Sequence, residues 1–247
     1  MRYADQIPMK KIVFTSGKGG VGKSTIAAAY GKILQKYGKN VLLVDFDISL
    51  RTMDIMLGVG DKVLYDWGDI LLDRCTPEEA VIENPDGPDL LPAPLTRVET
   101  SKQDICDMIS NYEDKYDFIL MDSPAGVGSG FQAALSSADM ALVLSTPDNI
   151  CVRSAAVAAE RLQEQKIPAK LIINRFERKS VENGRDLNVD DVIDETGLPL
   201  IGVVPEDENI AHTSRTGKNP DSTCPGAEAI LRIIHRLDGE RIPLKIV

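Results

Sequence analysis

The chain has 247 residues, of which 43% are hydrophobic and 27% are charged, and its formal net charge is −10. This length and composition are typical of a globular protein with a large core, built as one large α/β domain or two small ones. The negative charge disfavours broad electrostatic binding of nucleic acids, because their phosphates are repelled. No apolar run approaches the roughly 20 residues that a membrane-spanning helix needs.

The cysteines show no metal-binding spacing. They are scattered along the chain without a C-x-x-C pair, at Cys75, Cys106, Cys151 and Cys224. We therefore expect reduced thiols in a cytoplasmic protein. The first residues lack the apolar stretch of a signal peptide, so we expect 1–9 to be a short lead and 10–247 to form a single domain.

Short apolar runs alternate with helical patterns along the chain. Apolar strands are predicted at 12–14, 41–44, 118–121, 141–144, 171–173 and 200–204. Helical patterns include 24–37 and 149–165, and Thr76 is the predicted N-cap of a helix that begins with Pro77. Strands with two apolar faces predict a doubly wound α/β fold, with a mostly parallel sheet and helices on both faces. The segments 84–94 and 217–226, rich in Pro, Gly and Asp, are predicted as loops.

A complete Walker A motif follows the first predicted strand. The loop consists of Gly17, Lys18, Gly19, Gly20, Val21, Gly22, Lys23 and Ser24, with Thr25 directly after it. Its glycines let backbone N–H groups approach phosphate oxygens, and the helix that follows adds the partial positive charge of its N-terminus. We expect Lys23 to reach the β- and γ-phosphates of ATP and the Ser24 hydroxyl to bind Mg²⁺.

Three aspartates stand at the ends of predicted strands. Asp45 and Asp47 follow 41–44, and Asp122 follows 118–121. In open α/β sheets, ligands bind at the carboxyl ends of the strands. Carboxylates at this edge can hold the water ligands of Mg²⁺ or orient an attacking water, although each can also simply cap a turn.

The loop KGGVGKS, with Lys18 directly after the first glycine, resembles that of the deviant Walker A ATPases of the MinD/ParA family. Further segments are similar to the MinD-like branch of that family, from about residue 9 to the end of the chain. These are DFDISLRTMD at 45–54, VLYDW at 63–67, LPAPLTR at 91–97, DSPAG at 122–126 and PED at 205–207. The resemblance implies a P-loop NTPase fold of the SIMIBI type and slow, Mg²⁺-dependent hydrolysis of ATP that a partner stimulates.

The same resemblance implies roles for the site residues. In the family, the lysine equivalent to Lys18 reaches across an ATP-bound homodimer to the phosphates of the other subunit, so Lys18, Lys23 and Asp47 are the expected catalytic residues. Asp47 would position the attacking water, and Asp45 and Asp122 would support Mg²⁺ through water. The family grips adenine at positions matched here by Asn174, Arg175, Pro205 and Glu206.

The end of the chain departs from the family pattern. MinD-like proteins finish with a basic amphipathic helix that binds membrane, whereas this sequence stops at 241–247, about where that helix would begin. Pro243 disfavours continuation of the preceding helix, and nothing else supplies a basic amphipathic helix. We expect either a homologue that does not bind membrane by itself or a truncated chain. A further departure is Val127-Gly128 after DSPAG, where the family often has Ile-Glu.

The resemblance implies an ATP-dependent dimerising switch in the spatial regulation of cell division, at septum site placement. The expected partners are a second copy of the chain and an activator or division inhibitor, with peripheral membrane contact through such a partner. A ParA-type partition ATPase and a regulator of flagellar number or pole localisation are the alternatives. The acidic composition disfavours the first of these, and no nucleic acid is expected as a ligand.

Overall fold

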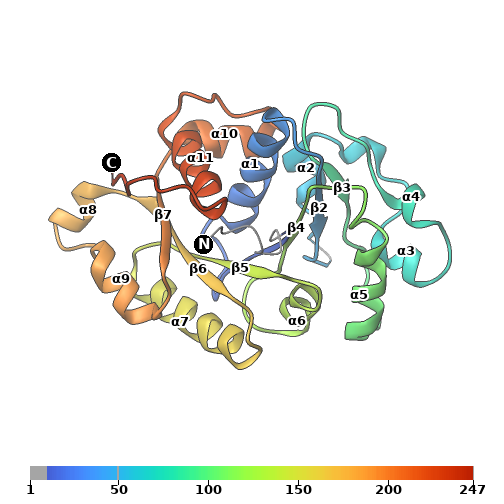
Figure 1. The fold of residues 1–247 in the computed structure, drawn as a ribbon, viewed down its shortest axis with the longest axis horizontal. Coiled ribbons are helices and arrows are strands. Elements are labelled where there is room, and N and C mark those ends of the chain that lie inside the picture. The colour runs from blue at the N-terminus through green and yellow to red at the C-terminus, as the bar shows by residue number, and fades with distance from the viewer. Residues whose placement is uncertain (1–9, 49, 247) are drawn as a thin grey trace, which may run out of the picture.

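The computed structural model describes residues 10–48 and 50–246, which form a seven-stranded parallel sheet covered by helices (Figure 1). The strands are β1 (Lys11–Thr15), β2 (Val41–Asp45), β3 (Asp89–Leu91), β4 (Phe118–Asp122), β5 (Met140–Ser145), β6 (Ala169–Phe176) and β7 (Leu200–Pro205). Their order in the sheet is β3-β2-β4-β1-β5-β6-β7. The predicted doubly wound α/β fold is confirmed. The predicted lead, 1–9, lies outside the described residues.

Eleven α-helices and one short 3₁₀ helix, η1 (Gly60–Lys62), are found in the described part of the chain. The α-helices are α1 (Lys23–Lys36), α2 (Met53–Leu57), α3 (Trp67–Leu71), α4 (Pro77–Ala80), α5 (Lys102–Ser110), α6 (Ser129–Leu135), α7 (Asn149–Glu164), α8 (Arg178–Glu182), α9 (Val189–Thr196), α10 (Glu208–Thr216) and α11 (Pro225–Leu237). No helix among these residues is long and apolar enough to cross a membrane.

Two apolar cores lie on the two faces of the sheet. Helices α1, α2, α10 and α11 pack on one face, and α3, α5, α6, α7 and α9 pack on the other (Figure 1). The alternation within β1 shows the division, because Ile12 and Phe14 face the first core and Val13 faces the second. Burial on both faces explains why the strands are continuously apolar.

Local sequence signals explain several element boundaries. Gly22 ends the phosphate loop in a left-handed conformation with φ of 89°, and α1 begins at the next residue. Thr76 and Glu79 form the expected capping box at α4. The prediction of a plain loop at 84–94 was wrong, since β3 lies within it and pairs in parallel with β2. Only three residues of β3 are paired, so its apolar pattern is too short to stand out among prolines and glycines.

The topology places β1 at the centre of the sheet, between β4 and β5. The chain moves from β1 outward to β2 and β3 on one side, and β5, β6 and β7 continue on the other. On one side of the loop after β1 lie the carboxyl ends of β4 and β2. On the other side lie those of β5, β6 and β7. Such a switch point is where open α/β sheets bind ligands.

Candidate functional site

The phosphate loop joins β1 to α1 and is held tightly by its neighbours. A Cβ atom at Gly17 would lie 1.8 Å from the carbonyl oxygen of Ser154 on α7, so only glycine fits there. Gly22 combines its positive φ with close contact to Asn174, whose Nδ2 would lie 2.4 Å from a Cβ atom. The Asn174 amide also donates to the carbonyl of Val21 at 2.7 Å. Two glycines of the motif are thus required by backbone geometry and packing.

Lys23 and Asp122 form a buried ion pair at the base of the loop. The distance between Lys23 Nζ and Asp122 Oδ1 is 2.6 Å, and Lys23 Nζ also donates to Ser24 Oγ at 3.2 Å. Among the buried side-chain polar atoms of the described residues, only Asp122 Oδ2 and Asn84 Nδ2 have no hydrogen-bond partner. A free, buried carboxylate oxygen near a serine hydroxyl fits the oxygen ligands and water molecules that Mg²⁺ prefers.

Asp45 and Asp47 stand beside this pair at the end of β2. Asp45 is opposite Asp122 in the register of β2 and β4, and its carboxylate accepts from the backbone N–H of Asp47 at 2.8 Å. Burial, reinforced by the charge of Asp122, raises the pKa of Asp45 to about 7. Burial also raises the pKa of Asp47, although Lys23 opposes this shift. The predicted carboxylates are therefore gathered around the lysine of the loop.

No group of three or more His, Cys, Asp or Glu side chains in 10–48 and 50–246 is arranged to hold a metal ion by itself. The donors that suit Mg²⁺ are instead the Ser24 hydroxyl and the carboxylates of Asp122 and Asp45, next to the phosphate loop. Mg²⁺ at nucleotide sites usually keeps several water ligands and takes few from the protein. This donor set fits an ion that is bound together with phosphates.

The four residues expected near adenine line one cavity of about 240 Å³ beside the loop. Asn174 and Arg175 come from β6, whereas Pro205 and Glu206 come from the end of β7. Arg175 has a left-handed φ of 55°, and its Nε lies 3.6 Å from Glu206 Oε2. The cavity also contains Gly22 and Thr25, so it opens onto the phosphate loop. The outer wall of the cavity lies on α10 and was not predicted from the sequence; it includes Ile210, Ala211, Ser214 and Arg215.

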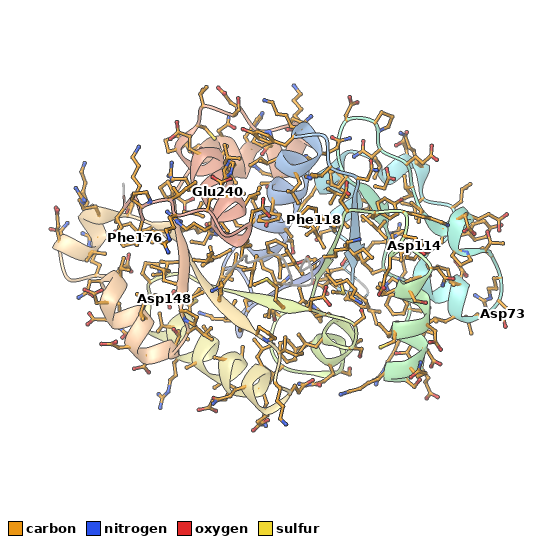
Figure 2. The ribbon with its side chains drawn as sticks, viewed as in Figure 1. Asp73, Asp114, Phe118, Asp148, Phe176 and Glu240 are labelled. Carbon is orange, nitrogen blue, oxygen red and sulfur yellow. The ribbon has the colours of Figure 1, made fainter. Side chains whose placement is uncertain are left out.

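Lys18 is placed differently from the other loop residues. It is exposed. The pKa of Asp148, which caps α7 and is labelled in Figure 2, is lowered mainly by hydrogen bonds from Cys151 and Thr146, and the positive charge of Lys18 lowers it further. The Ser16 hydroxyl donates to the backbone carbonyl of Lys18 at 2.8 Å and so fixes the backbone there. The Lys18 side chain takes no part in the Lys23–Asp122 pair.

Two further residues support the site and were not predicted. Trp67, on α3, donates its indole N–H to the carbonyl of Asp45 at 2.8 Å. Lys32, on α1, donates to the carbonyls of Met56, Gly217 and Lys218 at 2.8–2.9 Å and so joins the ends of α2 and α10. Burial lowers the pKa of Lys32 to about 8. Neither contact has a signal in local sequence, because each joins segments that are distant along the chain.

Known proteins resemble this chain over most of its length. A family model for the CobQ/CobB/MinD/ParA nucleotide-binding domain matches residues 12–220. The septum site-determining protein MinD of Bacillus subtilis is 35% identical over 246 residues, which cover 96% of this chain and 91% of that protein.

Solved structures have the same architecture. The MinC:MinD cell division protein complex of Aquifex aeolicus contains a chain that is 37% identical, with a TM-score of 0.87, and the match covers 95% of this chain and 98% of that one. The septum site-determining protein MinD of Pyrococcus horikoshii, solved with Mg-ADP, is 28% identical with a TM-score of 0.81, covering 92% of this chain and 95% of that one.

The fold and the phosphate loop define a P-loop ATPase that uses ATP with Mg²⁺. The chain belongs to the CobQ/CobB/MinD/ParA nucleotide-binding family, and its similarity is to the MinD proteins within it.

Proposed function

We propose that this chain is a MinD-like ATPase that acts as an ATP-dependent dimerising switch in the placement of the cell-division septum. The observation that carries the proposal is the loop of Gly17 to Ser24, in which a buried Lys23 faces the site and an exposed Lys18 faces outward. The likeness to MinD proteins over nearly the whole chain supports the septum-placement role. The ATPase unit is a single domain from residue 10 onward.

The residues around the loop divide the work of phosphoryl transfer. Lys23 and the loop N–H groups hold the phosphates, and Thr25 and the residues lining the cavity hold the nucleoside. Ser24 with Asp122 and Asp45 would hold Mg²⁺, which when bound neutralises charge on the phosphates. Asp47, partly exposed at the same edge, orients the attacking water. Its backbone N–H donates to the carboxylate of Asp45, which fixes the position of the Asp47 backbone and so of the first atoms of its side chain.

The exposed lysine supports a dimer as the active form. Lys18 of one subunit completes the phosphate site of the other, so a single chain holds ATP but lacks one of the cations that stabilise the developing charge. ATP thereby favours the dimer and hydrolysis releases it. A protein partner binds the dimer in preference to the monomer, which is consistent with the MinC:MinD complex of the Aquifex relative.

Three experiments test this function. Light scattering on a sizing column should show a dimer with ATP and Mg²⁺ but a monomer with ADP. A colorimetric assay of phosphate release should show slow ATP turnover that a partner stimulates. Deleting the gene should displace septa from their normal position while flagellar number stays unchanged. Normal septa with altered flagella would favour the pole-regulator alternative, and ATP-dependent, salt-sensitive DNA binding would favour a partition ATPase.

A further inference from the structure

One peptide group in the site is held at both ends. This group joins Asp45 to Phe46, directly before Asp47. Its N–H, from Phe46, donates to the carbonyl oxygen of Asp122 at 2.9 Å. Its C=O, from Asp45, accepts from the indole N–H of Trp67 at 2.8 Å. The plane of this peptide therefore depends on two bonds, one from the neighbouring strand and one from a side chain.

The hydrogen bond from Trp67 lies directly beyond the last paired residues of β2 and β3. The register between β2 and β3 stops at Val44 and Leu91, so Asp45 lies one residue beyond it. There the carbonyl oxygen of Asp45 is bonded by a side chain rather than by a strand. Figure 1 shows α3, which carries Trp67, on the side of the molecule where β2 and β3 lie.

Trp67 is itself fixed in place. Its backbone N–H donates to the carbonyl of Pro92 at 3.1 Å, and Asp66 caps the helix that begins with it. The side chain is 1% exposed, and its ring centroid lies 5.8 Å from that of Phe46. The indole cannot turn away from Asp45 without disturbing the core around Phe46, because buried side chains are close-packed.

We propose that Trp67 is a positioning residue for the ATPase reaction, which sets the direction of Asp47 through the Asp45–Phe46 peptide. The inference rests on the proposed role of Asp47. Without the indole N–H, the carbonyl oxygen of Asp45 loses its hydrogen bond and the Asp45–Phe46 peptide can rotate. The Asp47 carboxylate then adopts orientations in which it cannot orient the attacking water. Phosphate binding, which depends on the loop after β1, is unaffected. The effect therefore falls on turnover and not on nucleotide affinity.

The test replaces Trp67 with phenylalanine, which keeps a buried ring but has no N–H. The matched control is Tyr112→Phe, because the Tyr112 hydroxyl donates to the backbone carbonyl of Pro77 at 2.8 Å, far from the loop in sequence. Both variants lose one donor to a backbone carbonyl. We expect kcat to fall about tenfold only in Trp67→Phe, with KM for ATP and the Kd for ADP changed less than about twofold.

A second variant removes the N–H without changing ring size. Because Trp67 is the single tryptophan of the chain, 3-benzothienylalanine can replace it throughout the protein, with sulfur in place of N–H. It should reproduce the fall in kcat, whereas 4-fluorotryptophan, which keeps the N–H, should not. A kcat that stays at the level of Tyr112→Phe, or a KM that changes in step with kcat, would overturn the proposal.

Hydrogen exchange separates this inference from the function on which it rests. The Phe46 and Asp47 amides should exchange faster in both variants that lack the indole N–H, even in protein without nucleotide. Unchanged exchange at these amides would refute the positioning role. If the unmodified protein does not hydrolyse ATP, the ATPase assignment is refuted. Faster amide exchange in the variants would still show that the Trp67 bond holds the Asp45–Phe46 peptide.

Discussion

Lys23 Nζ lies 2.6 Å from Asp122 Oδ1, with both side chains buried, so the phosphate loop is tied to the end of β4 by an ion pair. We expect the same lysine to be the main cation for the phosphates, which would give it two anionic partners within one site. Movement of Lys23 between them would release Asp122 as nucleotide binds. A carboxylate with one oxygen already unpaired would then be free to act near Mg²⁺.

Replacing Lys23 with alanine should therefore have two effects. ATP binding should weaken by at least about 100-fold, because the main phosphate counter-charge is lost. The free energy of unfolding should fall by about 3–5 kcal/mol, since Asp122 is left buried without a cation. Calorimetric titration with ATP and urea unfolding measure the two effects. Lys36→Ala, at the exposed end of α1, should change neither, and unchanged ATP affinity in Lys23→Ala would refute the assignment.

Replacing Lys18 with alanine should separate binding from dimerisation. The side chain is exposed and takes no part in the buried ion pair. The monomer should keep its affinity for ATP within about twofold, because this lysine is expected to act on the partner's phosphates. Light scattering with ATP and Mg²⁺ should show no dimer. A Lys18→Ala protein that still dimerises with ATP would disprove the role in trans.

Replacing Asp47 with alanine should stop turnover while sparing assembly. Asp47 is only partly buried and bonds the site through its backbone N–H, so the loss of its side chain should leave the loop intact. We expect kcat to fall by about 100-fold or more and ATP to hold the protein as a dimer. Rapid-quench assays of one turnover measure the loss. Hydrolysis at the unmodified rate would move the water-orienting role to another residue.

The buried carboxyl of Asp45 should make stability depend on pH. Because burial raises its pKa to about 7, the folded chain binds this proton at pH values where the unfolded chain has lost it. The free energy of unfolding should therefore fall as pH rises from about 4 to 7, by at most about 1.4 kcal/mol per pH unit.

Urea unfolding of wild-type and Asp45→Asn protein, without nucleotide or Mg²⁺, measures this contribution as the difference between two slopes. The asparagine variant cannot titrate, so its stability relative to wild type should rise across the same interval. Asp114→Asn, at an exposed position labelled in Figure 2, serves as the control and should keep the wild-type slope. Parallel curves for Asp45→Asn and wild type would contradict the raised pKa.

Replacing Lys32 with methionine should loosen the helices around the nucleotide cavity. The Lys32 ammonium group bonds carbonyls at the ends of α2 and α10, and methionine would leave them without this donor. We expect a loss of about 2–4 kcal/mol in the free energy of unfolding. Thermal unfolding measures the change, with Lys36→Met as the exposed control on the same helix. Equal stability of the two variants would show that the three bonds contribute nothing.

The central site could be predicted because its signals are local. The Walker A spacing fixes the loop, and apolar runs that end in aspartate place Asp45 and Asp122 at one edge of a parallel sheet. Registers confirm that these two residues lie opposite each other. The roles of the individual residues, including the water-orienting role of Asp47, stay predictions.

The parts that escaped prediction depend on contacts between distant segments. Strand β3 has three residues, and its pairing with the distant strand β2 defines its place in the sheet. In the sequence, Lys32 is indistinguishable from an exposed helical lysine. Only the fold shows that three backbone carbonyls surround its ammonium group. Trp67 likewise reads as a core aromatic, and its bond to Asp45 joins residues 22 positions apart. Helix α10 carries no phosphate motif, and it is held at the cavity by contacts with α1 and α2, which are distant along the chain.

The burial of Trp67 against Phe46 has a practical consequence. The chain contains one tryptophan, so all of its indole fluorescence comes from a ring bonded to the strand end that precedes Asp47. Emission from this ring is sensitive to the polarity around it and to its hydrogen bond. Any shift of the Asp45–Asp47 segment during the nucleotide cycle would thus produce an optical signal from the unlabelled protein, fast enough to be followed in a stopped-flow instrument.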